Sequence, residues 1–548
     1  SNIDTYDARR HFASSGDFCL VLSGDDKQDI AFDNSYTNGV ANLKTLKEII
    51  LTQALMGQDR LLLYTEDTYK LDKYPFFGYL RGGYTKDEIK ELVAYGEEFG
   101  VELIPCIQTL GHLKRPLRWE PMIPLRDGET TLLADDEKVY EFIEEMIKFS
   151  RECFKSTDIH IGMDESTEMG LGRYLQFHKY TDRVELFSRH LDKVISICKK
   201  YNFKPMIWSD MYFRLNTENE EYYRNTPLPE STLKLIPEDI SLVYWDYYHD
   251  QEKTYDDMIS YHKDTNRDIV FAGGAWRWKG FAPSIQKSIE FSTAAMNSCI
   301  KNGLKDVFVT AWGDNGNECS LAGALPILAL YSVADYSQSV DEQSIDSLLK
   351  AITGDSLEDF KLMDLPDRPG GKVLSPHYDP SKFLLYQDPL NGIFDLQAKE
   401  EFKENYIKYA KILLEKSKTS KEYGYVYEIL SILCECLSIK ADLGVRLRKH
   451  YKEGNKAELK RIIKKEIPIL IAKLELLNKK HYLQWNKENK PFGYLKNRLS
   501  TTIVVVKDYL DGKVDSISEL ETEILPFNGH DDEISWNWWI QTCTVNDL

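Results

Sequence analysis

Two adjacent acidic residues, Asp164 and Glu165, directly follow a short, mostly apolar run in the N-terminal half of the chain. The run, 159–163, is typical of a buried strand. Carboxylates at the carboxyl end of a barrel strand lie where barrel enzymes carry out their chemistry, and neighbouring side chains on an extended chain can contact different atoms of one substrate. A second interpretation stays open from these residues alone, in which Asp164 caps a helix and Glu165 is solvated in its first turn.

The elements on either side of this run alternate between strand and helix. We predict eight strands, at residues 30–32, 60–64, 101–107, 159–163, 204–208, 240–245, 269–272 and 307–312. Such alternation indicates an α/β fold of the (β/α)8 TIM barrel type. A doubly wound sheet is the alternative, but it needs a glycine-rich phosphate-binding turn after the first strand, and the sequence has none there.

The sequence divides into an N-terminal remnant or extension, a catalytic barrel, a linker rich in Pro, Gly and Asp, and an α-helical C-terminal domain. We place these parts at 1–28, 29–364, 365–395 and 396–548. The first part contains one strand-like run, 18–22, and the last contains long amphipathic runs such as 457–485 and 495–510. Pro468 is expected to kink or interrupt the former. Three tryptophans near the C-terminus are expected to pack the chain end rather than bind ligand: Trp536, Trp538 and Trp539.

The composition limits the class of partner. The net charge of −19 argues against nucleic acid or an anionic membrane as the main partner. The aromatic content of 12% permits stacking of sugar faces on rings. Nine cysteines without metal-ligand spacing, and no recognisable signal peptide, lead us to expect reduced thiols and a cytoplasmic location.

Acidic, aromatic and basic residues follow every predicted strand. They are Asp33, Glu66, Asp67, His112, Asp164, Glu165, Trp208, Asp210, Tyr244, Trp245, Asp246, Tyr247, Trp276, Arg277, Trp312 and Asp314. The carboxyl ends of barrel strands meet on one rim, so these side chains are expected to line one pocket. One Trp alone more often belongs to a core, whereas Trp208, Trp245 and Trp312 at three matching strand ends favour a lined pocket.

Several hydrolase chemistries lack their motifs in this chain, which has no H-E-x-x-H, G-x-S-x-G or Walker sequence. A metal-dependent barrel hydrolase would typically carry several histidines near strand ends, whereas only His112 and His160 are so placed. We therefore expect no metal and no cofactor, with a metal site at His112 and nearby acids as the alternative.

The segment His160-Ile161-Gly162-Met163-Asp164-Glu165 closely resembles the His-x-Gly-x-Asp-Glu signature of family 20 glycoside hydrolases, the β-N-acetylhexosaminidases. It departs at Met163, where most of the family has glycine. The resemblance covers residues 30–335. The phrases PCIQTLGH, FGYLRGGY, VYWDYYH, FAGGAW and AWGDNG are similar to bacterial exo-acting members with a C-terminal helical domain.

The resemblance implies substrate-assisted, retaining hydrolysis. Glu165 would be the general acid and then the base, and Asp164 would orient the 2-acetamido group and stabilise an oxazolinium ion. Tyr247, in preference to Tyr244, would steady the acetamide oxygen. The resemblance further implies that Asp67 and His112 hold the acid, that Trp208, Trp245 and Trp312 enclose the acetamido methyl, and that Asp314 binds sugar hydroxyls.

Recognition of the sugar hydroxyls departs from the family pattern, because Tyr36 stands where an Arg is expected after strand one. Arg81 is a candidate substitute, and Asp33, Tyr244 and Trp276 are further expected substrate contacts. The expected substrates are glycans or glycoconjugates ending in β-GlcNAc or β-GalNAc, and a homodimer is left open. Two other functions also stay open, a glycan-binding protein on an inactive barrel and a metal-dependent barrel hydrolase.

Overall fold

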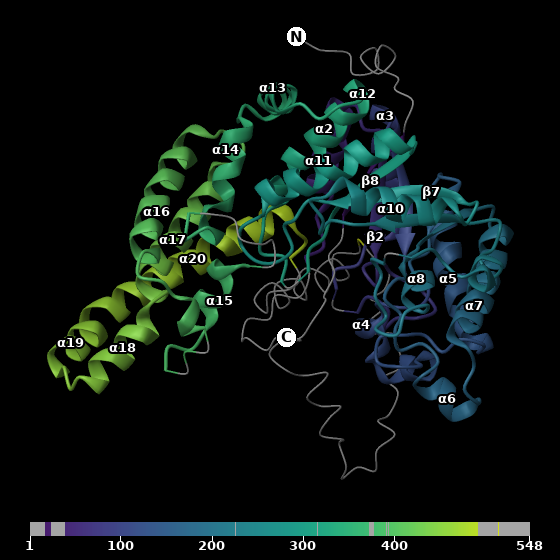
Figure 1. Cartoon of the computed structure of the whole chain (residues 1–548), viewed down its shortest axis with the longest axis horizontal. Coiled ribbons are helices and arrows are strands. Elements are labelled where there is room, and N and C mark those ends of the chain that lie inside the picture. The colour runs from purple at the N-terminus through teal and green to yellow at the C-terminus, as the bar shows by residue number, and fades with distance from the viewer. Residues whose placement is uncertain are drawn as a thin grey trace.

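The structure, a computed structural model, describes residues 17–22, 39–491 and 513, except for 80, 225, 315, 372–377, 391 and 393. Over these residues the chain forms a barrel and a helical domain that projects from its side (Figure 1). None of the described helices combines the length and the apolar character that a membrane span requires.

Eight parallel strands close into a barrel in chain order, which confirms the predicted fold class. They are β1 (Asp17–Leu22), β2 (Arg60–Thr65), β3 (Glu102–Ile107), β4 (Asp158–His160), β5 (Lys204–Trp208), β6 (Ser241–Trp245), β7 (Asp268–Gly274) and β8 (Asp306–Ala311). From β2 onward the strands are almost entirely buried, as expected for a parallel sheet with helices outside it and side chains filling its interior.

The first strand is not the one predicted. Residues 17–22, which fall in the predicted N-terminal extension, pair with β2 through Val21 and Leu62 and with β8 through Leu20 and Val309. The run 18–22 has five apolar residues in succession against three in 30–32, and long apolar runs are typical of strands in parallel sheets. The predicted strand at 30–32 lies outside the described residues.

Helices follow the strands and pack around the barrel (Figure 1). They are α2 (Leu43–Met56), α3 (Lys86–Phe99), α4 (Lys114–Leu117), η1 (Glu120–Leu125), α5 (Glu137–Cys153), α6 (Arg173–Phe177), α7 (Arg183–Lys200), α8 (Asp210–Arg214), α9 (Glu230–Leu233), α10 (Glu252–Lys263), α11 (Ile285–Asn302), η2 (Leu321–Ala324) and α12 (Leu325–Ser337). The capping box predicted at the start of α3 is present, with Thr85 and Glu88 exchanging backbone hydrogen bonds.

The described part of the chain after the barrel consists of helices and their connections, and short helical segments also occur in the stretch predicted as a linker. Its elements are α13 (Glu342–Thr353), α14 (Leu357–Lys361), η3 (Leu362–Asp367), α15 (Pro380–Tyr386), η4 (Asp395–Gln397), α16 (Phe402–Thr419), α17 (Gly424–Lys440), α18 (Leu443–Lys452), α19 (Lys456–Arg461), η5 (Ile462–Glu466) and α20 (Ile467–Glu488). Pro468 interrupts the long run as predicted, because α20 starts at Ile467 after a π-helical turn. The predicted helix at 495–510 and the C-terminal tryptophans lie outside the described residues.

The end of α20 joins the helical domain to the barrel. The Asn42 N–H at the start of α2 donates to the Glu488 carbonyl (3.1 Å), and the Lys490 N–H donates to the Val40 carbonyl (2.6 Å). Gln484 Nε2 donates to the Glu318 carbonyl in the segment after β8 (3.1 Å). Because α2 starts and β8 ends on the same rim, the helical domain is fixed at the carboxyl ends of the strands.

Candidate functional site

A tight turn after β4 brings Asp164 and Glu165 to the rim of the barrel. Gly162, Met163 and Glu165 all adopt the left-handed backbone conformation, with φ of 73°, 74° and 46°. Gly162 is required for space as well, since a Cβ there would lie 2.1 Å from Gln108 Oε1. Met163 is fully buried in a conformation that L-residues rarely adopt, which is a physical reason to favour glycine at this position.

Both carboxylate oxygens of Asp164 have partners. Gln108 Nε2 donates to Oδ1 at 2.8 Å, and His112 Nε2 lies 3.0 Å from Oδ2. The orientation of the Gln108 amide is set by the Met163 N–H, which donates to Gln108 Oε1 (3.1 Å). Asp164 is thus held by residues that follow β3 and by the turn after β4, in a mostly buried position.

Glu165 reaches further into solvent than Asp164, with 31% of its side chain exposed against 10%. His112 Nε2 lies 3.6 Å from Glu165 Oε2, and Arg214 Nη2 lies 3.4 Å from Oε1. The Glu165 N–H donates to Asp210 Oδ2 (3.0 Å), which also pairs with Arg214 Nε (2.8 Å). His112 therefore lies between the two acids, as expected of a group that positions both.

Burial sets the protonation of two neighbouring groups. It raises the pKa of Asp210 to about 6, against the opposing effect of Arg214 and with the help of the negative charges of Asp164 and Glu165. Burial also lowers the pKa of His160 to about 3. His160 is thus neutral at ordinary pH, and its ring packs against Trp208 at 4.3 Å between centroids.

Tyr247 lies at the centre of the aromatic cluster. Trp245 stacks on its ring at 5.5 Å, and Trp312 Nε1 donates to its hydroxyl (3.2 Å). Trp208 lies 5.9 Å from Trp312 between ring centroids, so the three predicted cage residues meet on one side of the rim. Trp276 supports this cluster from outside, since its Nε1 donates to the Tyr247 carbonyl (2.6 Å).

Other predicted residues lie elsewhere. The Tyr244 hydroxyl donates to Asp246 Oδ2 (2.9 Å), away from Tyr247. Arg81 forms a buried ion pair with Asp67 (2.9 Å), so both of these groups are engaged with each other. Asp314 is half-buried after β8, and Asp33 lies outside the described residues.

Within the described residues, one set of side chains is arranged so that it could hold a metal ion: His112, Asp164 and Glu165, whose ligand atoms lie within 4.8 Å of one another. These are the residues that would carry proton transfer in a metal-free reaction, so a cation and a substrate would compete for them.

Sequence reasoning missed Gln108, Arg214 and Tyr64. Gln108 Nε2 also donates to the Tyr64 hydroxyl (2.8 Å), and the Tyr64 ring packs edge-on against Trp312 at 5.1 Å. One signal is present in the sequence, since Gln108 is a polar residue directly after the apolar strand β3. Nothing in the sequence identifies its partner 56 residues away.

Two parts of the chain match family models. Residues 63–260 match the glycosyl hydrolase family 20 catalytic domain, and residues 358–537 match the glycoside hydrolase 20C C-terminal domain. Hexosaminidase D of Bos taurus is 26% identical over 217 residues, covering 37% of this chain and 58% of that protein. Hexosaminidase D of Homo sapiens is 27% identical over 220 residues, covering 37% and 42%. The chain thus spans about half the length of these relatives.

Solved structures also match the chain, at low identity. A β-N-acetylhexosaminidase from Bacteroides fragilis has a TM-score of 0.43 at 14% identity, covering 59% of this chain and 65% of that one. A GH20 exo-β-N-acetylglucosaminidase from Vibrio harveyi, in complex with N-acetylglucosamine, has a TM-score of 0.44 at 12% identity, covering 62% and 57%.

Proposed function

Because the chain belongs to glycoside hydrolase family 20, we propose that it is an exo-acting β-N-acetylhexosaminidase. It removes terminal, non-reducing β-linked GlcNAc or GalNAc from glycans by substrate-assisted, retaining hydrolysis. The observation that carries this proposal is the pair of acids after β4, in which Asp164 accepts a hydrogen bond from Gln108, His112 Nε2 lies 3.0 Å from its other oxygen, and Glu165 lies beside it, more open to solvent.

In the first step the acetamide oxygen of the substrate attacks the anomeric carbon while Glu165 donates a proton to the departing glycosidic oxygen. The products are the free aglycone and a bicyclic oxazolinium ion. Asp164 accepts a hydrogen bond from the acetamide N–H and offsets the positive charge that develops there. A carboxylate that is held by a hydrogen bond in a mostly buried position suits this electrostatic role, because little reorganisation is needed as the charge develops.

In the second step Glu165 removes a proton from a water molecule, which attacks the anomeric carbon and reopens the oxazolinium ring. The configuration is retained because the carbon is attacked twice. The acetamide gains a large proximity advantage when its methyl group is enclosed, and the cluster of Trp208, Trp245 and Trp312 around Tyr247 is suited to that. The Tyr247 hydroxyl is the group we assign to the acetamide oxygen.

The decisive experiment is turnover of aryl β-GlcNAc and β-GalNAc glycosides by the wild type and by Asp164→Asn. The variant keeps the shape but loses the charge, and we expect its rate to fall by about 10²–10³. It should also bind a thiazoline mimic of the intermediate more weakly, with a smaller loss for the product sugar.

Three outcomes would contradict the proposal in different ways. A glycosyl ester on Asp164, trapped with a fluorinated sugar and seen as a mass shift, would replace the assisted mechanism by a direct nucleophile. Glycan binding without turnover would indicate a lectin-like protein. Loss of activity in a chelator, restored by a divalent cation, would favour a metal-dependent hydrolase at His112.

A further inference from the structure

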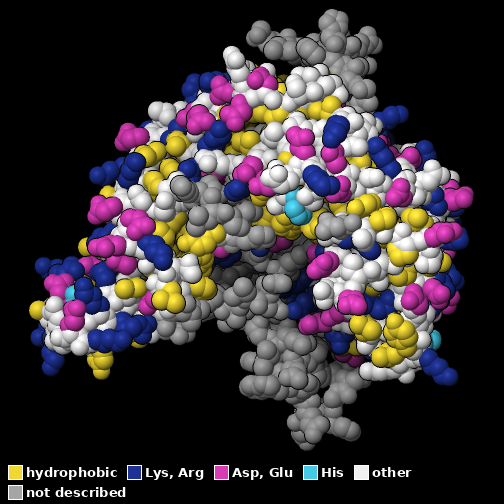
Figure 2. Space-filling view, viewed as in Figure 1, with side chains coloured by type: hydrophobic (Ala, Val, Ile, Leu, Met, Phe, Trp, Pro, Cys, Tyr) yellow, Lys and Arg dark blue, Asp and Glu magenta, His cyan; other side chains and the backbone are white. Residues whose placement is uncertain are grey.

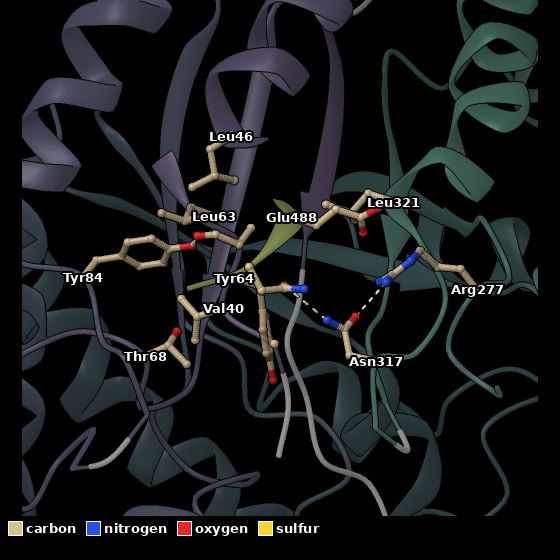
Figure 3. A pocket seen from close by; sticks show the side chains of 13 residues that line it. Val40, Leu46, Leu63, Tyr64, Thr68, Tyr84, Arg277, Asn317, Leu321 and Glu488 are labelled. Carbon is tan, nitrogen blue, oxygen red and sulfur yellow. Dashed lines mark hydrogen bonds between the residues drawn. The ribbon is translucent and has the colours of Figure 1, made fainter. Parts of the chain in front are cut away.

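A pocket lies between the barrel rim and the end of α20 (Figure 3). The pocket is small and partly open to solvent, and it has contributions from the segment before α2, from β2, from the segments after β7 and β8, and from α20. Three of its polar residues form a chain of hydrogen bonds that joins the barrel to the helical domain. Arg277 Nη2 donates to Asn317 Oδ1 (2.6 Å), and Asn317 Nδ2 donates to Asn489 Oδ1 (3.4 Å).

Several hydrogen-bonding groups of this pocket are unused. Arg277 is almost fully buried, and its Nε has no partner among the described residues. Across the part of the chain that the structure describes, Asn489 Nδ2 and the Thr68 hydroxyl also have no hydrogen bond. Buried polar groups are normally paired, because an unpaired group costs free energy. This cost applies to the enclosed Arg277 Nε, whereas Asn489 Nδ2 and the Thr68 hydroxyl open to the pocket and are available to a ligand that supplies oxygen atoms.

The rest of the lining narrows the class of ligand. Glu488, which accepts from Ser320 Oγ (2.6 Å) and from the Tyr425 hydroxyl (2.8 Å), places a carboxyl group in the wall and disfavours an anion. Leu63 and Val40 add apolar surface. Hydroxyl oxygens beside C–H faces are the chemistry of a neutral sugar, and this mixed lining is what such a ligand requires.

A single side chain, that of Tyr64, connects the pocket to the residues around the proposed catalytic groups. Tyr64 forms part of its wall, packs against Trp312 and accepts a hydrogen bond from Gln108, which holds Asp164. With eight strands in order, the β4 end lies across the rim from the β8 end. The contact between Tyr64 and Trp312 is thus the link between this pocket and the tryptophan cluster, at which the acetamido group is proposed to bind.

We propose that this pocket binds hydroxyl groups of the terminal sugar, and that Asn489 of the helical domain is a specificity-determining residue of the site. The helical domain is then part of the substrate-binding site, with Asn489 Nδ2 and the Thr68 hydroxyl as donors to the sugar and Asn317 as the residue that orients Asn489. This inference rests on the proposed hexosaminidase function, which it deepens.

The test is a comparison of substrates with and without individual hydroxyls. KM and kcat are measured for an aryl β-GlcNAc glycoside and its 3-, 4- and 6-deoxy analogues with the wild type, Asn489→Ala and Thr68→Val. Each variant removes one neutral hydrogen bond to the sugar, so we expect KM for the parent substrate to rise by about three- to tenfold with little change in kcat. For one of the deoxy analogues, the variant and the wild type should have the same KM. That analogue lacks the hydroxyl group that the substituted side chain would bind.

Gln484→Ala is the matched control. It lies on the same helix and removes a contact between the domains, but it does not line the pocket, so KM should stay within about twofold of the wild type. The thermal midpoint of each variant separates misfolding from a binding defect, and Thr68→Val keeps the shape of the side chain. The inference is wrong if both folded variants bind all four substrates as the wild type does. If the wild type turns over no hexosaminide, the proposed function itself has failed.

Discussion

Gln108 offers the sharpest test of how the site works. Its amide donates to Asp164 and its own oxygen is occupied by the Met163 N–H, so a carboxyl group at this position would place an oxygen against Asp164 Oδ1. At the 2.8 Å of the present contact, two negative charges repel by about 6 kcal/mol at an effective dielectric constant of about 20. This corresponds to about four pKa units. In Gln108→Glu the two carboxyl groups would therefore share one proton, and the pKa for its loss would lie well above the usual range of a carboxyl group.

The consequence is a change in pH dependence. At acid pH the introduced carboxyl group is protonated and can donate to Asp164 as the amide does, so the variant should retain much of its activity. As pH rises through the raised pKa of the pair, the shared proton is lost and the introduced carboxylate repels Asp164 instead of donating to it. The variant's kcat/KM should then fall by about 10²–10³ relative to the wild type. Ordinary ionisation of an isolated Glu would instead place the change near about pH 4.

The assay is kcat/KM for an aryl β-GlcNAc glycoside across the range from acid to mildly alkaline pH. Gln108→Leu is the control, since it removes the donor without adding a titratable group and should lower the rate by a factor that does not depend on pH. A Gln108→Glu profile parallel to that of the wild type would refute the reasoning, because it would mean that Gln108 does not govern the charge of Asp164.

Three other substitutions test separate features. Glu165→Gln should impair cleavage of natural disaccharides more than that of activated aryl glycosides, because protonation matters most for a poor leaving group; equal loss on both would contradict the acid role. Met163→Gly should unfold at higher denaturant concentration than Met163→Ala, because the left-handed conformation costs a residue with a Cβ about 1–2 kcal/mol; the reverse order would show that backbone strain does not decide the difference in stability. Asp210→Asn should gain stability relative to the wild type as pH rises from about 3 to 7, by up to about 3 kcal/mol, since the pKa of Asp210 is raised to about 6 and its ionised form is therefore disfavoured in the fold; a pH-independent difference between their unfolding free energies would count against it.

The strands from β2 to β8 could be predicted because a parallel strand covered on both sides is a short apolar run bounded by polar residues. The same rule failed at β1, where two apolar runs compete and only pairing with β2 and β8 decides between them. The helical domain could be predicted from its long amphipathic runs. Figure 2 shows Lys and Arg interspersed with Asp and Glu on the face that it presents.

The polar contacts of the site could be predicted only in part. The position of Asp164 and Glu165 at a strand end follows from local sequence, but their partners do not. Arg81 shows why, because its charge suggested a substrate contact and its position makes it the buried partner of Asp67. Pairings of this kind depend on how distant segments meet, and sequence periodicity holds no information about that meeting.

The two proposals together place catalysis and sugar recognition on different parts of the rim. The acids and His112 follow β3 and β4, whereas the pocket at Asn489 is built on the β2, β7 and β8 side and closed by a helix of the second domain. Tyr64 connects the two sides, since it lines the pocket and contacts both Trp312 and Gln108. A substitution at Asn489 should therefore alter which sugar hydroxyls are bound, while proton transfer at Glu165 continues. In such an arrangement the C-terminal domain supplies binding specificity to a barrel that already contains its catalytic groups, and kcat and KM should respond to substitutions on opposite sides of one rim.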